Sequence, residues 1–188
     1  MLASQSEVCY RTDMIRTALL IAALLVAPAH AQTSTAKKPA AKAPAATAFD
    51  ATNPQSLMDV LGAAGATVQT SRKDGDAVFV AVTSTAATFS LQFAACNAQG
   101  RACRAVLMDA ARPRSAVTVA QINAFNQTSV MCRLYQDRAG APHVAYSTLL
   151  FRTTSRDDMA NHLLAWQGCL SDAHDFLRDP VSYLASAA

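Results

Sequence analysis

The sequence has 188 residues and a formal net charge of +3, from 16 Lys and Arg against 13 Asp and Glu. From Phe49 onward the charges balance, with eleven basic and eleven acidic residues. This balance argues against a nucleic-acid-binding protein, which needs a basic surface, so no nucleic-acid partner is expected. The excess positive charge lies before Phe49, in Lys37, Lys38 and Lys42.

The segment 14–32 predicts a secretory signal peptide. Arg16 gives a basic start, Ala18 to Ala27 form an apolar run, and Ala29-His30-Ala31 is an A-x-A cleavage signal. We expect residues 1–31 to be removed, with Met14 as an alternative start, and the protein to be periplasmic or secreted. The apolar run is about half of the ~20 residues that a membrane-spanning helix needs, so no stable span is expected after removal.

The next segment, residues 32–54, is built mainly from Ala, Pro, Thr and Lys. Such a composition buries too little apolar surface to offset the entropy of ordering the chain, which predicts a flexible linker. Residues 55–188 then suit one domain with one hydrophobic core.

The first half of this domain predicts a helix followed by four strands. Apolar residues recur at helical spacing over 55–62, and alternating β-branched runs flank Asp74-Gly75, which predicts a hairpin with strands over 66–71 and 77–83. In the next strand, from Thr88, the polar Ser90 and Gln92 alternate with three apolar residues and are assigned to a solvent-facing side of the sheet. A fourth strand follows over 103–110.

The second half predicts a helix, two strands and a long helix. The helix over 118–127 follows the potential cap Thr118, and strands are expected over 130–137 and 143–151. Ser155 and Asp158 form a capping signal for the last helix, which should end before Pro180. The order α-β-β-β-β-α-β-β-α, with hairpin-length connections, predicts an α+β fold with an antiparallel sheet packed by helices.

Four cysteines follow the predicted signal peptide, an even number in a chain expected in an oxidising compartment. Cys96 and Cys103 flank a turn, and their spacing differs from that of zinc sites and thioredoxin-type motifs, which favours a hairpin disulfide. Cys132 and Cys169 are then left for each other. Two buried thiols are the alternative for the second pair.

The predicted middle helix carries two asparagines, Asn123 and Asn126, on either side of Phe125. Asparagine competes with the helix for backbone hydrogen bonds, so we expect both side chains to bond a neighbouring loop rather than a ligand.

The segment INAFN (122–126), the strand opening CRAVLM (103–108), the N-terminal LMDVLGAAGATV (57–68) and the aromatic last helix together resemble the YbjN family. The resemblance covers about 55–177. It implies a fold similar to type III secretion chaperones and a role in bacterial sensory transduction. Many members carry an arginine-aromatic stretch after the second asparagine, then an acidic, glycine-containing turn that leads to a strand with further aspartates. The corresponding stretches here read QTSVMCRLY and QDRAGAPHVAYSTLLF, largely without the acids.

Candidate catalytic residues are few. Asp158 and His162 are four residues apart on the last helix, and His174-Asp175 lies further along it, but no third partner has a matching spacing. We interpret these as solvated helix positions and His143 as a turn-edge residue. No catalytic, cofactor or metal site is therefore predicted.

The resulting hypothesis is an exported, non-enzymatic binding or regulatory module with a protein or peptide partner, and homodimerisation is one arrangement that we consider. A periplasmic thiol-redox factor or an enzyme using the cysteines or histidines is the alternative, which an exposed, low-pKa thiol pair would favour.

Overall fold

The structure is a computed structural model that describes residues 48–187. The predicted signal peptide (1–31) and residues 32–47 of the predicted linker lie outside the described residues.

The ordered domain begins earlier than the predicted boundary at Gln55. Helix α1 (Pro54–Ala63) starts at Pro54, and the Asn53 side chain caps it by accepting from the Gln55 N–H. Before the helix, Ala51 and Thr52 are buried, and the Thr52 hydroxyl donates to the Asp50 carboxylate at 2.7 Å. Linker composition therefore misassigned residues 51–54, because contacts with the core and a cap hold this segment in place.

The predicted first strand, 66–71, is two short strands in the structure. β1 (Thr67–Val68) and β2 (Arg72–Asp74) both pair with β3 (Ala77–Thr83). The hairpin turn after β2 places Gly75 at φ +58°, a conformation that favours glycine. Asp74-Gly75 therefore correctly predicted the turn, but the strand that enters the turn lies closer to it than expected.

The remaining elements follow the predicted order. They are β4 (Thr88–Ala94), β5 (Ala105–Ala111), α2 (Val119–Thr128), β6 (Arg133–Gln136), β7 (Pro142–Leu149), α3 (Arg156–Arg178) and α4 (Pro180–Ala187). The sheet is antiparallel with strand order β1-β3-β4-β5-β7-β6, and β2 pairs with β3 beside β1. The α+β fold class is confirmed.

The structure has one further helix, α4, that the sequence pattern did not predict. α3 ends at Arg178, as Pro180 suggested, but α4 starts at Pro180 itself. Proline is well tolerated at the first helical position. Asp179 caps α4, because its carboxylate accepts from the Ser182 N–H at 3.1 Å and from the Ser182 hydroxyl at 2.7 Å.

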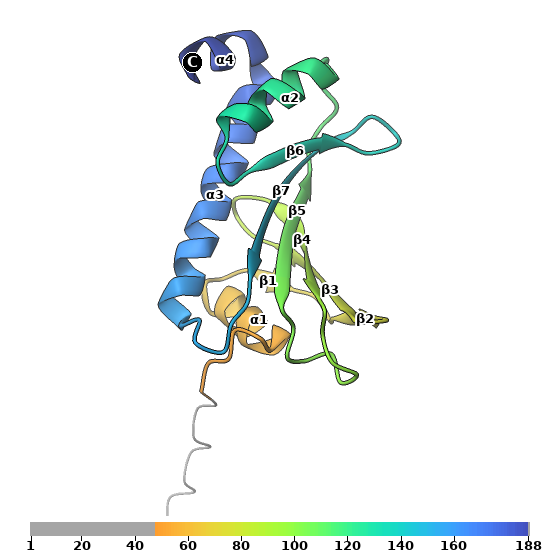
Figure 1. The fold of residues 1–188 in the computed structure, drawn as a ribbon, viewed down its shortest axis with the longest axis vertical. Helices are drawn as coiled ribbons and strands as arrows, with labels where there is room; N and C mark the ends of the chain where they lie inside the picture. The colour runs from red at the N-terminus through yellow and green to blue at the C-terminus, as the bar shows by residue number, and fades with distance from the viewer. Residues whose placement is uncertain (1–47, 188) are drawn as a thin grey trace, which may run out of the picture. The chain divides into compact units, whose positions relative to one another are not determined.

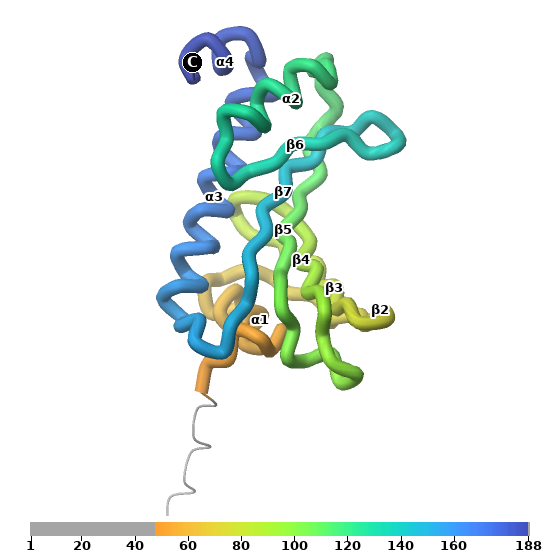
Figure 2. Tube along the Cα trace, in the orientation of Figure 1, coloured from red at the N-terminus to blue at the C-terminus, as the bar shows by residue number. Residues whose placement is uncertain are grey.

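The core lies between the helices and one face of the sheet. α3 runs along the sheet and packs on β7, while α1 lies near one end of α3 and α2 and α4 lie near the other (Figures 1 and 2). Inward residues of the central strands alternate with outward ones, as expected for an antiparallel sheet with one packed face. The largest buried side chains include Trp166, Phe93, Phe125 and Phe176.

Candidate binding surface

The second face of the sheet, which we call the open face, points away from the helices (Figure 1). Its residues are those between the buried positions of β3, β4, β5 and β7. Several are apolar or small, where solvent-facing strand positions are usually polar. The open face comprises Phe79, Ala81, Ser90, Gln92, Ala94, Ala105, Leu107, Asp109, His143, Ala145, Ser147 and Leu149.

Ser90 and Gln92 lie on the open face, as their alternation with buried residues predicted. The three apolar residues between and beside them, Phe89, Leu91 and Phe93, are buried against the helices. Ser90 pairs with Asp109 of β5, and its hydroxyl donates to the Asp109 carbonyl at 3.4 Å. Gln92 pairs with Leu107, so the two predicted polar residues sit at the centre of the sheet.

A cluster that the sequence did not predict extends this surface to the edge of the sheet. The Asp109 carboxylate accepts from the Tyr135 hydroxyl at 2.6 Å and contacts His143 Nδ1 at 2.8 Å. The rings of Tyr135 and His143 stack with centroids 4.9 Å apart. We call Asp109, Tyr135 and His143 the Asp109 cluster. His143 is therefore part of a polar network rather than only a turn-edge residue.

The electrostatics of the Asp109 cluster favour a neutral Tyr135. Burial, the hydrogen bond to Asp109 and the charges of Asp109 and Asp137 all raise the pKa of Tyr135 far above its ordinary value, with burial the largest cause. The second carboxylate, Asp137, lies 3.9 Å from His143 Nε2. Both ring nitrogens of His143 thus face carboxylate oxygens, and the cluster adds polar groups at one edge of a face that is mostly small and apolar.

The other two histidines of the described residues, His162 and His174, lie elsewhere, and His162 was misassigned. His162 was expected on a solvated helix face, but its ring packs on the sheet, with Nδ1 2.6 Å from the Tyr146 hydroxyl and Nε2 3.3 Å from Thr148 Oγ1. A contact between α3 and β7 that sequence spacing cannot show explains the difference. His174 is exposed, as predicted. The sheet separates His162 from His143, so the histidines do not form one site.

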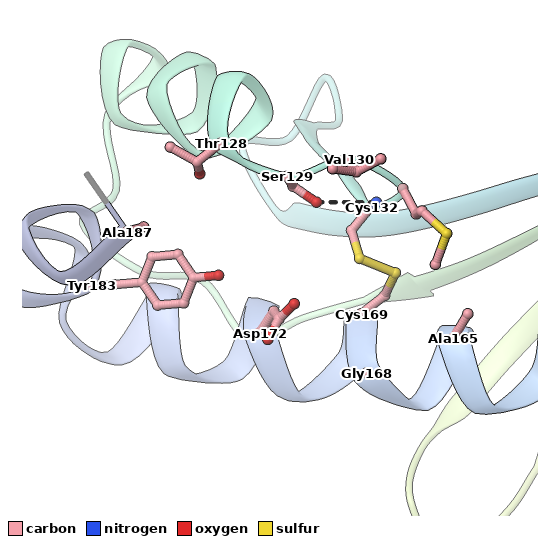
Figure 3. A pocket seen from close by; sticks show the side chains of 11 residues that line it. Thr128, Ser129, Val130, Cys132, Ala165, Gly168, Cys169, Asp172, Tyr183 and Ala187 are labelled. Carbon is pink, nitrogen blue, oxygen red and sulfur yellow. Dashed lines mark hydrogen bonds between the residues drawn. A yellow bond between two sulfur atoms is a disulfide. The ribbon is translucent and has the colours of Figure 1, made fainter.

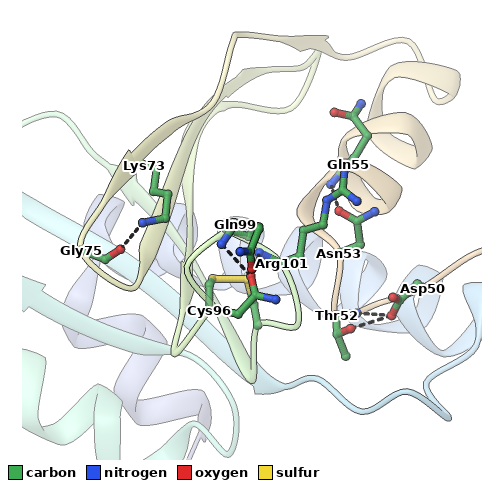
Figure 4. Close-up of a disulfide and its surroundings, with 12 residues drawn as sticks. Asp50, Thr52, Asn53, Gln55, Lys73, Gly75, Cys96, Gln99 and Arg101 are labelled. Carbon is green, nitrogen blue, oxygen red and sulfur yellow. Dashed lines mark hydrogen bonds between the residues drawn. A yellow bond between two sulfur atoms is a disulfide. The ribbon is translucent and has the colours of Figure 1, made fainter.

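The cysteines form two disulfides. Cys96 and Cys103 are joined with an S–S distance of 2.06 Å, and the connection between them turns through Gly100 at φ +69°. Figure 4 shows this disulfide beside the segment before α1, where Thr52 lies. The Thr52 carbonyl accepts from the Cys103 N–H at 2.9 Å, which ties that segment to the hairpin. Two disulfides are typical of proteins in oxidising compartments.

The second disulfide joins Cys132 of the α2–β6 connection to Cys169 of α3, with an S–S distance of 2.01 Å. It borders a cavity of about 380 Å³ between that connection, α3 and α4 (Figure 3). The cavity's titratable side chains are Asp172 and Tyr183, and burial is the main cause that raises the pKa of Tyr183. Both sulfurs belong to buried residues, including Cys169, which has no exposed surface.

The two asparagines of α2 behave differently. Asn126 bonds the main chain of Leu134 in β6 through both atoms of its side-chain amide, which is the kind of contact that was expected. Asn123 is exposed and makes no side-chain hydrogen bond to the described residues, so its expected bond was wrong. Phe125 is fully buried and packs on Phe176 and Tyr183.

Within residues 48–187, no three His, Cys, Asp or Glu side chains lie close enough together to hold a metal ion. In the same range, the helices are too short or too polar to span a bilayer.

The YbjN family profile matches residues 53–178, from the cap of α1 to the last residue of α3. The chain belongs to the YbjN family. The family is described as "Putative bacterial sensory transduction regulator". This YbjN match includes the open face, the Asp109 cluster and both disulfides. Comparisons with curated proteins and with solved structures gave no significant match.

Proposed function

We propose that this YbjN protein is an exported, non-enzymatic regulatory module that binds a protein or peptide partner on the open face of its sheet. The observation that carries the proposal is the composition of that face. Leu107 lies between Gln92 and Ser147, Leu149 pairs with Ala105, and Leu149 is 61% exposed. Apolar surface of this kind is typical of interaction sites, and the Asp109 cluster adds polar groups at fixed positions beside it.

The two disulfides support export and argue against the thiol-redox alternative. A redox factor needs an accessible, activated thiol pair, whereas the four cysteines within residues 48–187 are all buried, with Cys96 the most exposed at 8%. The family description supports a regulatory role. The resemblance of the family to type III secretion chaperones favours chaperone-like binding of another protein as the way in which it would act.

Site-specific photo-crosslinking in the native host tests the proposal. A photo-reactive residue is placed at Ser90, on the open face, or at Asn161, an exposed control position on α3. We expect a discrete crosslinked adduct from position 90 but not from position 161, and we expect Gln92→Lys to abolish it because Gln92 lies on the same face. Adducts from both positions in equal yield, or none from position 90, would contradict the proposal.

A further inference from the structure

A second cavity carries an unusual concentration of positive charge. It has a volume of about 190 Å³ and lies between the β5–α2 connection and the last turns of α3. Three arginines, one histidine and one serine line it, and no carboxylate does. Its lining residues are Arg112, Pro113, Arg114, Ser115, His174, Leu177 and Arg178.

The arginines of this cavity lack strong counter-charges among the described residues. Neither Arg112 nor Arg114 forms an ion pair there, and Arg178 contacts only the exposed Asp175, at 3.5 Å. The presence of Arg178 is explained by its position near the C-terminus of α3, because cations there complement the helix dipole. That reason does not apply to Arg112 and Arg114, which come from the connection before α2.

Two polar atoms of the lining residues are buried without a hydrogen-bond partner in the described structure: Arg112 Nε and Ser115 Oγ. Such atoms are rare in folded proteins, and here both belong to the same side of one cavity. Both atoms are covered by the protein, so a bound group would reach the rotatable Ser115 hydroxyl only after the side chain moves. Within the described residues, two of the three arginines of the site, Arg112 and Arg114, therefore have no ion pair, and two polar atoms beside the cavity have no hydrogen-bond partner.

We propose that this cavity binds a phosphate group. Guanidinium groups match the oxygens of phosphate with paired hydrogen bonds, and a doubly charged anion relieves the repulsion among several cations at once. The volume is below the ~300 to 1,000 Å³ of pockets that enclose whole drug-sized ligands, so the cavity accommodates a small anion or the charged end of a larger molecule. Inorganic phosphate and the phosphate of an anionic lipid headgroup share this chemistry.

The first experiment titrates the purified, disulfide-bonded protein with inorganic phosphate at fixed ionic strength and measures binding by calorimetry. We expect saturable binding that Arg114→Gln and Arg178→Gln each weaken by about tenfold or more, since each removes a charge-assisted hydrogen bond. The control is Arg156→Gln, which makes the same charge change at the opposite end of the same helix, about 33 Å away. This control should bind like the parent protein.

A second experiment separates the two sources of phosphate by sedimentation with phosphatidylglycerol vesicles. Vesicle binding that inorganic phosphate displaces, and that Arg114→Gln removes, identifies a lipid headgroup; phosphate binding without vesicle binding identifies the free anion. Both results support the site. The proposal is wrong if phosphate binding does not saturate, or if Arg156→Gln weakens it as much as Arg114→Gln. The open face would be unaffected by that failure, because it shares no residue with this cavity.

Discussion

The side chain of Asn126 forms two hydrogen bonds with the main chain of Leu134. Its Nδ2 donates to the Leu134 carbonyl at 2.9 Å, and its Oδ1 accepts from the Leu134 N–H at 2.8 Å. Leu134 belongs to β6, the strand at one edge of the sheet, and Asn126 occupies the position where a further strand would form its hydrogen bonds. Unpaired edge strands invite association with other chains, so Asn126 both fastens α2 and blocks part of this edge.

Asn126→Ala should therefore destabilise the protein, because it leaves two partly buried main-chain groups without partners. We expect a loss of about 1 to 3 kcal/mol in the free energy of unfolding, measured by urea denaturation. Asn123→Ala is the matched control on the same helix and should stay within about 0.5 kcal/mol of the parent, since Asn123 is exposed. Equal effects of the two substitutions would show that the Leu134 contact contributes little.

Local patterns predicted much of this fold. The alternation around Ser90 and Gln92 identified which residues face away from the helices, because successive strand residues point to opposite faces. Ser155 and Asp158 form the capping box at the start of α3 that their spacing predicted. The second predicted disulfide, between Cys132 and Cys169, is also present.

The Asp109 cluster could not be predicted in this way, because its residues meet only through the order of the strands. β5 pairs with β7 rather than with the sequentially nearer β6, and Asp109 lies 26 residues before Tyr135 and 34 before His143. Periodicity reports the face of each residue but not which strands are neighbours. The one available signal was an aspartate inside an apolar strand, where this residue is disfavoured.

The two disulfides should contribute unequally to stability. In the chain-entropy estimate, the bridge between Cys132 and Cys169, 37 residues apart, is worth about 4 kcal/mol, and the bridge between Cys96 and Cys103, 7 residues apart, about 2 kcal/mol. Urea denaturation of the two double Cys→Ala variants measures the difference. The opposite result, a larger loss of stability without the Cys96–Cys103 disulfide, would contradict this estimate. It would mean that the β4–β5 connection and its bond to Thr52 depend on that disulfide more than the attachment of α3 depends on the other one.

Asp109→Asn should lower the pKa of Tyr135, because it removes the nearest negative charge, although burial should still hold that pKa above its ordinary value of 10.0. Because the pKa of Tyr135 is raised in the folded state, its contribution to stability is fully present below pH 10. This contribution is lost as the pH rises through the folded-state pKa. Because its Tyr135 pKa is lower, the Asp109→Asn variant should show the absorbance change of tyrosinate formation at a lower pH than the parent protein. Asp157→Asn, an exposed substitution at the start of α3, should leave the titration unchanged, and an unchanged titration in Asp109→Asn would contradict the contact.

Substitutions of the histidines test whether the partner binds the open face or a site on α3. His162 and His174 lie on α3, away from the open face, so His162→Gln together with His174→Gln should preserve the crosslinked adduct from position 90. This double variant should lose about 1 kcal/mol of stability through the Tyr146 contact. His143→Gln changes the open face itself and should reduce the adduct while leaving the fold intact, as far-ultraviolet circular dichroism would show. If the double variant folds normally but loses the adduct from position 90, the partner's binding site includes α3, and the proposal of a binding surface on the open face is wrong.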